Sequence, residues 1–303
     1  MGSTKEIGMH RQAVLGSTLA LAALLVAAPA IAQQPPQALS VQQLSPNVYV
    51  AVGGGGNSGI VVGDTGVVVI DAKTTAAAGR QLLDEVAKIT TKPVTDVILT
   101  HSDGDHVNGL ASFPAGVHVI AQEACRTELE AALAAGGRGA PPADHMPTKV
   151  VTRPAERVTL DGVAFELHHW APAHTSGDLI VYLPAEKIVF TGDIITTNRP
   201  DPLIHLEKHG SSEGWIKTVQ GLLTLHSDKF VPGHGDLQTK ADVKTRLDTT
   251  TKKREQIAAL VKEGKSLDEI RTAVGDPAPP AGGRGGGFAS FTDVVYREST
   301  GGR

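Results

Sequence analysis

One ten-residue segment concentrates side chains that can bind a metal ion. It reads Thr-His-Ser-Asp-Gly-Asp-His-Val-Asn-Gly over residues 100–109 and follows the apolar run 94–99, which is typical of a buried strand. Its candidate ligands are two histidines and two aspartates within six residues: His101, Asp103, Asp105 and His106. A turn loosened by Gly104 lets them converge. Because imidazole and carboxylate groups suit zinc, iron or manganese, the segment predicts a metal centre without thiolates.

Three further signals of the same kind occur later in the chain. His174 follows the predicted strand 163–170, Asp193 follows the run 188–190, and His234 follows residues 230–231. Each has a glycine close by that gives the backbone room to turn. One histidine after a strand is more often structural than functional. Four such signals in one chain, one of them a dense cluster, favour a single shared site.

The composition of the chain argues against several classes of protein. The chain has 303 residues, of which 41% are hydrophobic, so a sizeable core is expected and disorder is excluded as the main state. The net charge is −4 and no Lys/Arg-rich segment longer than Lys-Lys-Arg at 252–254 occurs, which argues against nucleic-acid binding. A single cysteine, Cys125, allows neither an internal disulfide nor a cysteine-based zinc site. We interpret it as a small core residue.

Short strands and amphipathic helices are expected to position these side chains. After a Pro/Gln-rich lead-in at 33–44, hydrophobic patterning predicts strands at 48–52, 60–62, 67–70, 94–99, 117–120, 157–160, 163–170, 179–183, 188–190 and 230–231. It predicts helices at 75–89, 122–134, 214–223, 241–263 and 266–274, and a short helix at 288–298. Gly/Pro-rich loops are expected at 136–148 and 275–287. Two halves rich in strands and helices, followed by terminal helices, indicate a layered α/β sandwich.

Two other catalytic motifs are matched by spacing but not by context. Gly54, Gly56 and Gly59 fit a dinucleotide-binding fingerprint, yet a strand is predicted where that motif needs a helix. Residues 210–214 fit the Gly-x-Ser-x-Gly pattern of a nucleophile elbow, but the residues before it are polar and do not predict a buried strand. A turn that caps the following helix is the better interpretation.

The N-terminus has the pattern of an export signal. Lys5, His10 and Arg11 precede an apolar run at 13–30, which ends in Ala-Ile-Ala at 30–32. The small-residue exit favours cleavage after Ala32 over an uncleaved membrane anchor. We therefore predict a signal peptide at 1–32, a periplasmic or secreted protein, and no stable membrane association after cleavage.

From about Val48 to Asp236 the chain resembles the metallo-β-lactamase-fold hydrolases. The family's first motif, His-x-His-x-Asp-His, stands here as His101-x-Asp103-x-Asp105-His106. The family's third histidine, bridging acid and last histidine match His174, Asp193 and His234. The resemblance implies a four-layer αββα sandwich as the catalytic domain, at residues 45–238. Residues 239–303 would then be a C-terminal helical extension with a Gly/Pro-rich loop.

The resemblance also implies two divalent ions. One would be held by His101, Asp103 and His174, the other by Asp105, His106 and His234, and Asp193 would bridge them. Asp103 departs from the family, which usually has histidine there. A carboxylate adds negative charge and a harder oxygen donor, which weakens the preference for zinc somewhat and shifts it toward iron or manganese. Zinc is the first choice, with iron or manganese as alternatives, and whether Asp103 is a ligand stays open.

The activity implied is that of an exported metallo-hydrolase. A metal-bridging hydroxide would cleave an ester, lactone, thioester or amide bond, a β-lactam among them. Asp105 would be a catalytic residue that also orients the nucleophile, and His205 and His209 are candidates to contact a small-molecule substrate. Two alternatives remain: a di-iron redox protein on the same fold, which Asp103 favours, and a non-catalytic periplasmic binder stabilised by one metal. The sequence predicts no oligomeric state.

Overall fold

The computed structural model describes residues 1–2, 38–136, 141–276 and 288–302. Apart from its first two residues, the predicted signal peptide at 1–32 lies outside the described residues. So do positions 137–140 and 277–287 of the two predicted Gly/Pro-rich loops. Within the described ranges, no helix combines the length and apolarity that crossing a bilayer requires.

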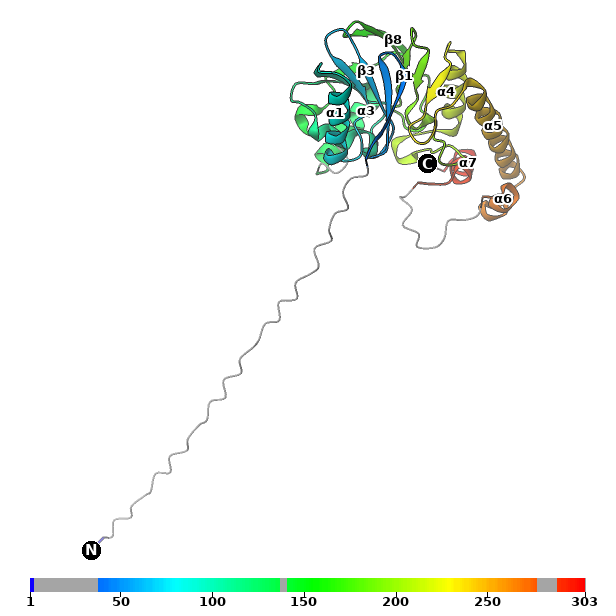
Figure 1. Cartoon of the computed structure of the whole chain (residues 1–303). Coiled ribbons are helices and arrows are strands. Elements are labelled where there is room, and N and C mark those ends of the chain that lie inside the picture. The colour runs from blue at the N-terminus through cyan, green and yellow to red at the C-terminus, as the bar shows by residue number, and fades with distance from the viewer. Residues whose placement is uncertain (3–37, 137–140, 277–287, 303) are drawn as a thin grey trace. The chain divides into compact units, whose positions relative to one another are not determined.

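The strands form two sheets (Figure 1). The first has seven strands in sequence order: β1 (Ser40–Ser45), β2 (Val48–Val52), β3 (Ser58–Val62), β4 (Val67–Ile70), β5 (Val94–Ile98), β6 (His118–Gln122) and β7 (Lys149–Val151). It is antiparallel up to β4 and parallel from β4 to β7. The second follows the order β12 (Lys229–Val231), β11 (Ile188–Phe190), β10 (Ile180–Leu183), β9 (Val163–His168) and β8 (Ala155–Leu160). Its only parallel pair is β11 with β12.

Alternation along the strands builds the core between the sheets. Successive side chains of a strand point to opposite faces. In β4, Val68 and Ile70 join a cluster that also contains Phe165 and Leu167 of β9, so this cluster lies between the two sheets. The neighbouring residues of β4, Val67 and Val69, belong to a separate cluster with helical residues.

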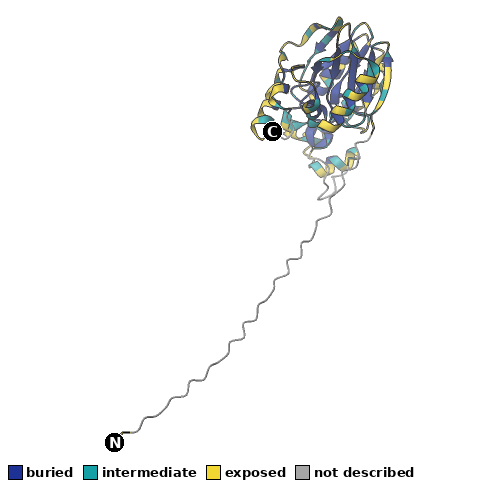
Figure 2. Cartoon of the chain, turned by 60° about the vertical axis from the view of Figure 1, so that its left-hand side comes forward, coloured by how far each residue is buried: buried dark blue, intermediate teal, exposed yellow. Residues whose placement is uncertain are grey.

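Helices cover the outer face of each sheet. The helices α1 (Ala76–Ile89) and α3 (Glu123–Ala134) pack on the first sheet, where Cys125 is a buried free thiol, as predicted. The helices α4 (Ser212–Thr224), α5 (Lys240–Lys262), α6 (Leu267–Val274) and α7 (Phe291–Thr300) share a cluster with the outer face of the second sheet. Figure 2 shows buried residues concentrated in the strands and exposed residues along the helices. The fold is therefore the predicted four-layer αββα sandwich with a helical C-terminal extension.

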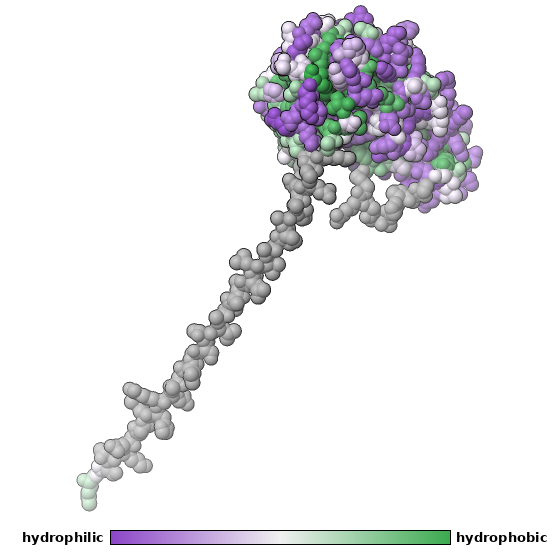
Figure 3. Space-filling model, in the orientation of Figure 1, coloured by the Kyte–Doolittle hydropathy of each residue, from purple (hydrophilic) through white to green (hydrophobic). Residues whose placement is uncertain are grey.

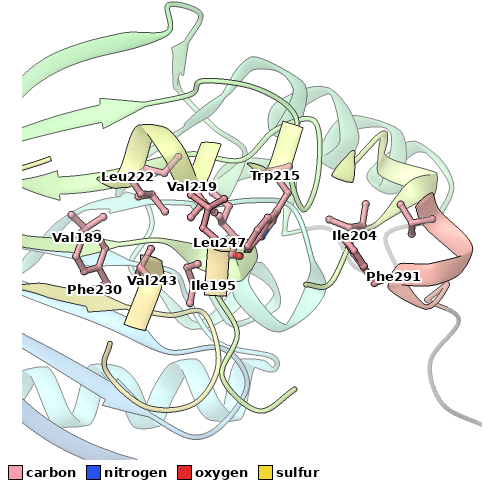
Figure 4. Close-up of a cluster of buried hydrophobic side chains, with 14 of the residues drawn as sticks. Val189, Ile195, Ile204, Trp215, Val219, Leu222, Phe230, Val243, Leu247 and Phe291 are labelled. Atoms are coloured by element: carbon pink, nitrogen blue, oxygen red, sulfur yellow. Dashed lines mark hydrogen bonds between the residues drawn. The ribbon is translucent and has the colours of Figure 1, made fainter. Parts of the chain in front are cut away.

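Trp215 of α4 lies in the middle of the outer cluster on the second sheet (Figure 4). It is fully buried, and its indole Nε1 donates a hydrogen bond to the carbonyl of Ile194 at 2.6 Å. Val243 and Leu247 of α5 pack in the same cluster, while most of α5 faces outward and its side of the molecule is largely hydrophilic in Figure 3. The C-terminal helices thus share one core with the second sheet.

The structure confirms some of the local predictions and corrects others. Ser266 and Glu269 form a capping box at the start of α6, and Ser211 caps α4, as predicted for this turn, by accepting a hydrogen bond from the amide of Gly214. The lead-in predicted at 33–44 is wrong from residue 40, where β1 begins. Polar side chains dominate β1, and the three-residue β7 is too short for a periodic pattern, so neither strand was predicted. The last helix begins at Phe291 and not at residue 288.

Candidate metal centre

The first motif begins in the turn after β5, which holds His101 and Asp103, and continues into a short helix, α2 (Gly104–Val107), which holds Asp105 and His106. Asp103 is the extended N-cap residue of α2, and its carbonyl accepts a hydrogen bond from the amide of His106 at 2.9 Å. The turn leaves His101 and His106 fully buried, while the side chain of Asp105 is 38% exposed. One local fold therefore carries both interior ligands and a ligand that reaches solvent.

The other three predicted ligands also follow strands. His174 comes after β9, Asp193 lies in the 3-10 helix η3 (Gly192–Ile194) after β11, and His234 comes after β12. All seven predicted ligands take part in three groups whose ligand atoms lie within 4.8 Å of one another. These are His101, Asp103 and His174; Asp105, His106 and His234; and His101, His106 and Asp193. The structure thus brings together every side chain proposed as a ligand.

The distances suit two neighbouring cations. In the first set, Asp103 Oδ2 lies 3.0 Å from His174 Nε2 and 3.9 Å from His101 Nε2. In the second set, Asp105 Oδ2 lies 3.0 Å from His234 Nε2 and 3.9 Å from His106 Nε2. Bonds of about 2.1 Å place tetrahedral ligand atoms about 3.4 Å apart, so the separations are those of ligands around an ion.

Asp193 lies between the two sets. Its Oδ1 is 3.3 Å from His106 Nε2 and 3.4 Å from His234 Nε2, both of the second set. Its Oδ2 is 4.0 Å from His174 Nε2 of the first set. One oxygen of the carboxylate therefore faces each set, as a bridging ligand requires.

Hydrogen bonds behind the histidines aim them at the centre. Asp71 Oδ2 lies 2.7 Å from His106 Nδ1, and the same carboxylate accepts hydrogen bonds from the amide and hydroxyl of Thr100. His174 Nδ1 lies 2.9 Å from the carbonyl of Leu203. Such partners fix ring orientation and tautomer. Asp71 was not predicted, although its place directly after β4 resembles the placement of the other site residues.

Three buried atoms of the site make no hydrogen bond with any described residue. They are His101 Nε2, His106 Nε2 and Asp193 Oδ1. Buried polar atoms are normally paired, because an unpaired one loses its hydration without replacement. All three point into the centre defined by the ligand groups. A cation would satisfy them together, so the donor set fits a metal centre.

Electrostatics agree with a centre built for positive charge. Burial would lower the pKa of His106, but the carboxylates of Asp71 and Asp193 raise it well above its ordinary range. Burial would also lower the pKa of His174, but the hydrogen bond that it donates to the carboxylate of Asp103 helps to raise this pKa to about 9. Burial favours the neutral form of Asp193, yet the charge of His106 holds its pKa well below its ordinary range. The raised pKa values favour protonated His106 and His174 when no metal is bound, so metal binding should release protons from them.

Lys73 supports the glycine turn behind the site. Its ammonium is fully buried and donates hydrogen bonds to the carbonyls of Ala51 at 2.6 Å and Gly56 at 2.8 Å. Burial lowers its pKa from 10.5 to about 7, although the charge of Asp71 acts in the opposite direction. Between pH 7 and about pH 10 the unfolded chain therefore binds a proton that the folded chain has lost.

This difference predicts the pH dependence of stability. As pH rises from 7 to 10, the chelator-treated protein should gain stability over its Lys73→Met variant, by up to about 1.4 kcal/mol per pH unit. Urea unfolding of both proteins at several pH values measures the difference. The Lys92→Met control removes a half-buried amine that is hydrogen-bonded to the carbonyl of Gly63, but it keeps Lys73. Its stability should therefore follow the same pH dependence as that of the parent. Parallel pH profiles for the parent and Lys73→Met would contradict the prediction.

The two predicted substrate contacts lie in different surroundings. His205 Nδ1 is 3.1 Å from Asp103 Oδ1, and its ring lies 4.7 Å from that of Phe288. It also lines a cavity of about 450 Å³ between the residue 204–207 segment and the helices α6 and α7. His209 is exposed, and among the described residues no contact joins its side chain to the metal centre. The structure thus places His205, and not His209, beside the centre.

Comparisons with known proteins agree with the fold. The model of the metallo-beta-lactamase superfamily matches residues 51–234. The alpha subunit of a 2,4-dinitroanisole O-demethylase from Nocardioides sp. (strain JS1661) is 28% identical over 57% of this chain and 51% of its own. A metallo-beta-lactamase type 2 from Bacteroides fragilis is 27% identical over 71% of this chain and 89% of its own.

Among solved structures, a stereoselective inverting sec-alkylsulfatase from Pseudomonas sp. superposes with a TM-score of 0.66 at 20% identity, over 86% of this chain and 50% of its own. This chain thus spans about half the length of the demethylase subunit and of the sulfatase. The family's match covers more than half of the chain and contains all seven predicted ligands, from His101 to His234. The chain therefore belongs to the metallo-beta-lactamase superfamily.

Proposed function

We propose that the protein is an exported hydrolase that depends on two divalent metal ions and cleaves an ester, lactone, thioester or amide bond. The observation that carries the proposal is the convergence of seven donor side chains in two sets that share Asp193. Zinc is the first choice of metal, and iron or manganese are the alternatives. Two such ions, when bound, supply Lewis acidity and a water molecule that is acidic near neutral pH.

The chain's own residues complete the chemistry. Asp105 is the most exposed of the three carboxylates in the centre, so its side of the site is where a substrate enters. There it can accept a hydrogen bond from the attacking water and orient it. Neither a serine nor a cysteine nucleophile is needed, and the single Cys125 is buried on the outer face of the first sheet.

The cavity beside His205 is our candidate for binding the rest of the substrate. Its wall includes apolar side chains, among them Ile204, Leu267 and Phe288, and the exposed cation Arg297. A volume of about 450 Å³ is in the range of small-molecule sites. We infer a small organic substrate, with His205 as a contact. His209 remains a weaker candidate, because it does not line this cavity.

The relatives extend the range of bonds that the proposed hydrolase could cleave. Their names include a β-lactamase, an O-demethylase and an alkylsulfatase, so the superfamily's site serves several leaving groups. Since Asp103 stands where β-lactamases of the fold have histidine, we place ester, lactone and thioester cleavage before β-lactam cleavage. Periplasmic or secreted localisation and the absence of nucleic-acid partners are further parts of the proposal.

Metal removal tests the proposal directly. Purified protein should contain two metal ions per chain and hydrolyse at least one member of a panel of chromogenic esters, lactones, thioesters and nitrocefin. A chelator should abolish turnover and lower the melting temperature by about 5–10 °C, because saturation at about 100 times the dissociation constant contributes about 2.7 kcal/mol. Zinc, manganese or iron should restore both.

The alternatives give different results in the same assays. Iron at two per chain, with an absorbance change on exposure to dioxygen and no turnover, would favour the redox protein. Substoichiometric metal and an unchanged melting temperature after chelation would favour the non-catalytic binder. Metal-independent turnover, or none on any substrate, would count against the proposed hydrolase.

A further inference from the structure

A lysine lies against the carboxylate that departs from the family's pattern. Lys208, in the 3-10 helix η4 (Leu206–Lys208), places its Nζ 2.6 Å from Asp103 Oδ1. His205 Nδ1 lies 3.1 Å from the same oxygen. The other oxygen, Oδ2, faces the imidazoles of His174 and His101. His205 Nδ1 also lies 3.3 Å from Oδ2, whereas the ammonium of Lys208 contacts Oδ1. Oδ2 thus faces the metal centre and Oδ1 faces η4.

Lys208 is held in this position from several directions. Its carbonyl accepts a hydrogen bond from the amide of Ser176 at 2.8 Å, beside the His174 loop. Its ammonium also donates to Ser102 Oγ at 2.7 Å. Ser102 in turn donates to Glu128 of α3, which also accepts a hydrogen bond from Ser176 Oγ. The contact with Asp103 is therefore part of a network that joins α3, the first motif and η4, unlike an isolated surface ion pair.

The charges account for the pairing. Where the family's pattern has a neutral histidine, Asp103 adds one negative charge to a centre that already contains Asp105 and Asp193. The ammonium of Lys208 returns the sum to that of the family's pattern. It also holds Oδ1, so that the carboxylate can offer a cation only Oδ2. Partners of metal ligands commonly act in this way, by fixing the ligand's orientation and tuning its basicity.

We propose that Lys208 is a positioning residue and that the Asp103–Lys208 pair replaces the family's neutral histidine ligand as one charge-balanced unit. This inference rests on the proposed two-metal centre. It predicts that each member of the pair suits only its present partner. If histidine replaced Asp103 alone, the ammonium of Lys208 would face a divalent cation without a counter-charge. If methionine replaced Lys208 alone, the carboxylate would lose its fixed orientation.

Metal affinity in a double-mutant cycle tests the pairing. Four proteins are compared: the parent, Lys208→Met, Asp103→His and the double variant. Zinc dissociation constants come from competition with a chromogenic chelator, and the number of ions per chain comes from elemental analysis. Each single variant should bind the weaker of its two zinc ions about 10-fold less tightly than the parent does. The zinc affinity of the double variant should be within about threefold of that of the parent. The Lys208→Met change would then weaken zinc binding when Asp103 is present but strengthen it when Asp103 has been replaced by histidine.

Two further variants exclude simpler explanations. Lys208→Arg keeps the cation and should stay within about threefold of the parent. Lys253→Met removes a comparably buried lysine–aspartate pair, with Asp201 at 2.6 Å, and should leave zinc affinity unchanged. Circular dichroism and melting curves identify any variant that does not fold. If the variants that carry Asp103→His do not fold, the comparison of Lys208→Met with Lys208→Arg decides alone.

The outcomes separate this inference from the proposed function. If the parent binds two ions but the effects of the two single variants simply add, or if Lys208→Arg behaves like Lys208→Met, the pairing is overturned and the two-metal centre stands. If the parent retains no metal, the proposed function fails, and this inference fails with it.

Discussion

Replacing Asp193 with asparagine is expected to reduce kcat/KM by about 10³-fold or more and to leave at most one metal ion per chain. The buried carboxylate faces His106 and His234 with one oxygen and His174 with the other. Asparagine keeps the volume but removes the charge, and it offers one oxygen where two are needed. Turnover on the best substrate found for the parent and elemental analysis of the purified variant measure both effects.

Asp236→Asn is the matched control for this change. Asp236 lies two residues after His234 but is exposed, and its described hydrogen bonds involve only the backbone: its amide donates to Thr197 Oγ1, and its carbonyl accepts from Gln238 Nε2. The control should keep two ions and activity within about threefold of the parent, in the range of surface substitutions. Two tightly bound ions in the Asp193→Asn variant would show that Asp193 does not bridge the sets.

Replacing Gly56 with alanine should be the second most damaging change, with kcat/KM lowered about 10²-fold and one ion lost. A Cβ at this position would lie 2.2 Å from Cε1 and 2.4 Å from Nε2 of His106, closer than any real contact. The ring cannot move aside, because it is fully buried and its Nδ1 is bonded to Asp71. The backbone is also restrained, since the amide of Gly56 donates to the carbonyl of Asp105 at 3.0 Å.

A glycine in open surroundings provides the comparison. Gly116 is exposed, and an added Cβ there would meet no atom within 4 Å, so Gly116→Ala tests the general effect of alanine in a turn. It should retain both ions, with a stability cost from its positive φ of 84° alone. Full metal content in a folded Gly56→Ala protein would mean that His106 is not a ligand.

The structure of the glycine turn shows why the spacing of its glycines does not indicate dinucleotide binding. Gly54, Gly56 and Gly59 match a dinucleotide fingerprint, yet β3 begins at Ser58 and contains Gly59, so a strand stands, as predicted, where that motif needs a helix. Gly56 is needed because the turn passes directly over the ring of His106. Its backbone is tied to Asp105 on one side and, through Asn57, to Gly233 on the other. The turn therefore contacts both halves of the metal centre.

The ligands themselves could be predicted because each follows a strand. Apolar runs mark the strands, and the carboxyl ends of parallel strands, such as β5 in one sheet and β11 and β12 in the other, collect loops at one edge. Short Gly-containing motifs at those ends single out His101, His174, Asp193 and His234 without knowledge of the fold. The family's pattern then supplies their grouping into two sets, which the distances support.

The partners of the ligands required the folded chain. Lys208 is 105 residues from Asp103 in the sequence, and no periodicity or motif marks it as part of the site. Asp71 lies 35 residues before His106, and Lys73 reaches back to Ala51 and Gly56. Such contacts depend on how loops from different strands pack, which local patterns do not encode.

The sequence by itself thus singled out seven candidate metal ligands, since residue type and strand-end position are local properties. Only the tertiary structure decided how the charge of Asp103 is balanced, which histidine of the 205–209 segment faces the centre, and why the turn needs glycine at position 56. These depend on distances between side chains far apart in the chain, and such distances are set by the packing of the two sheets and their loops.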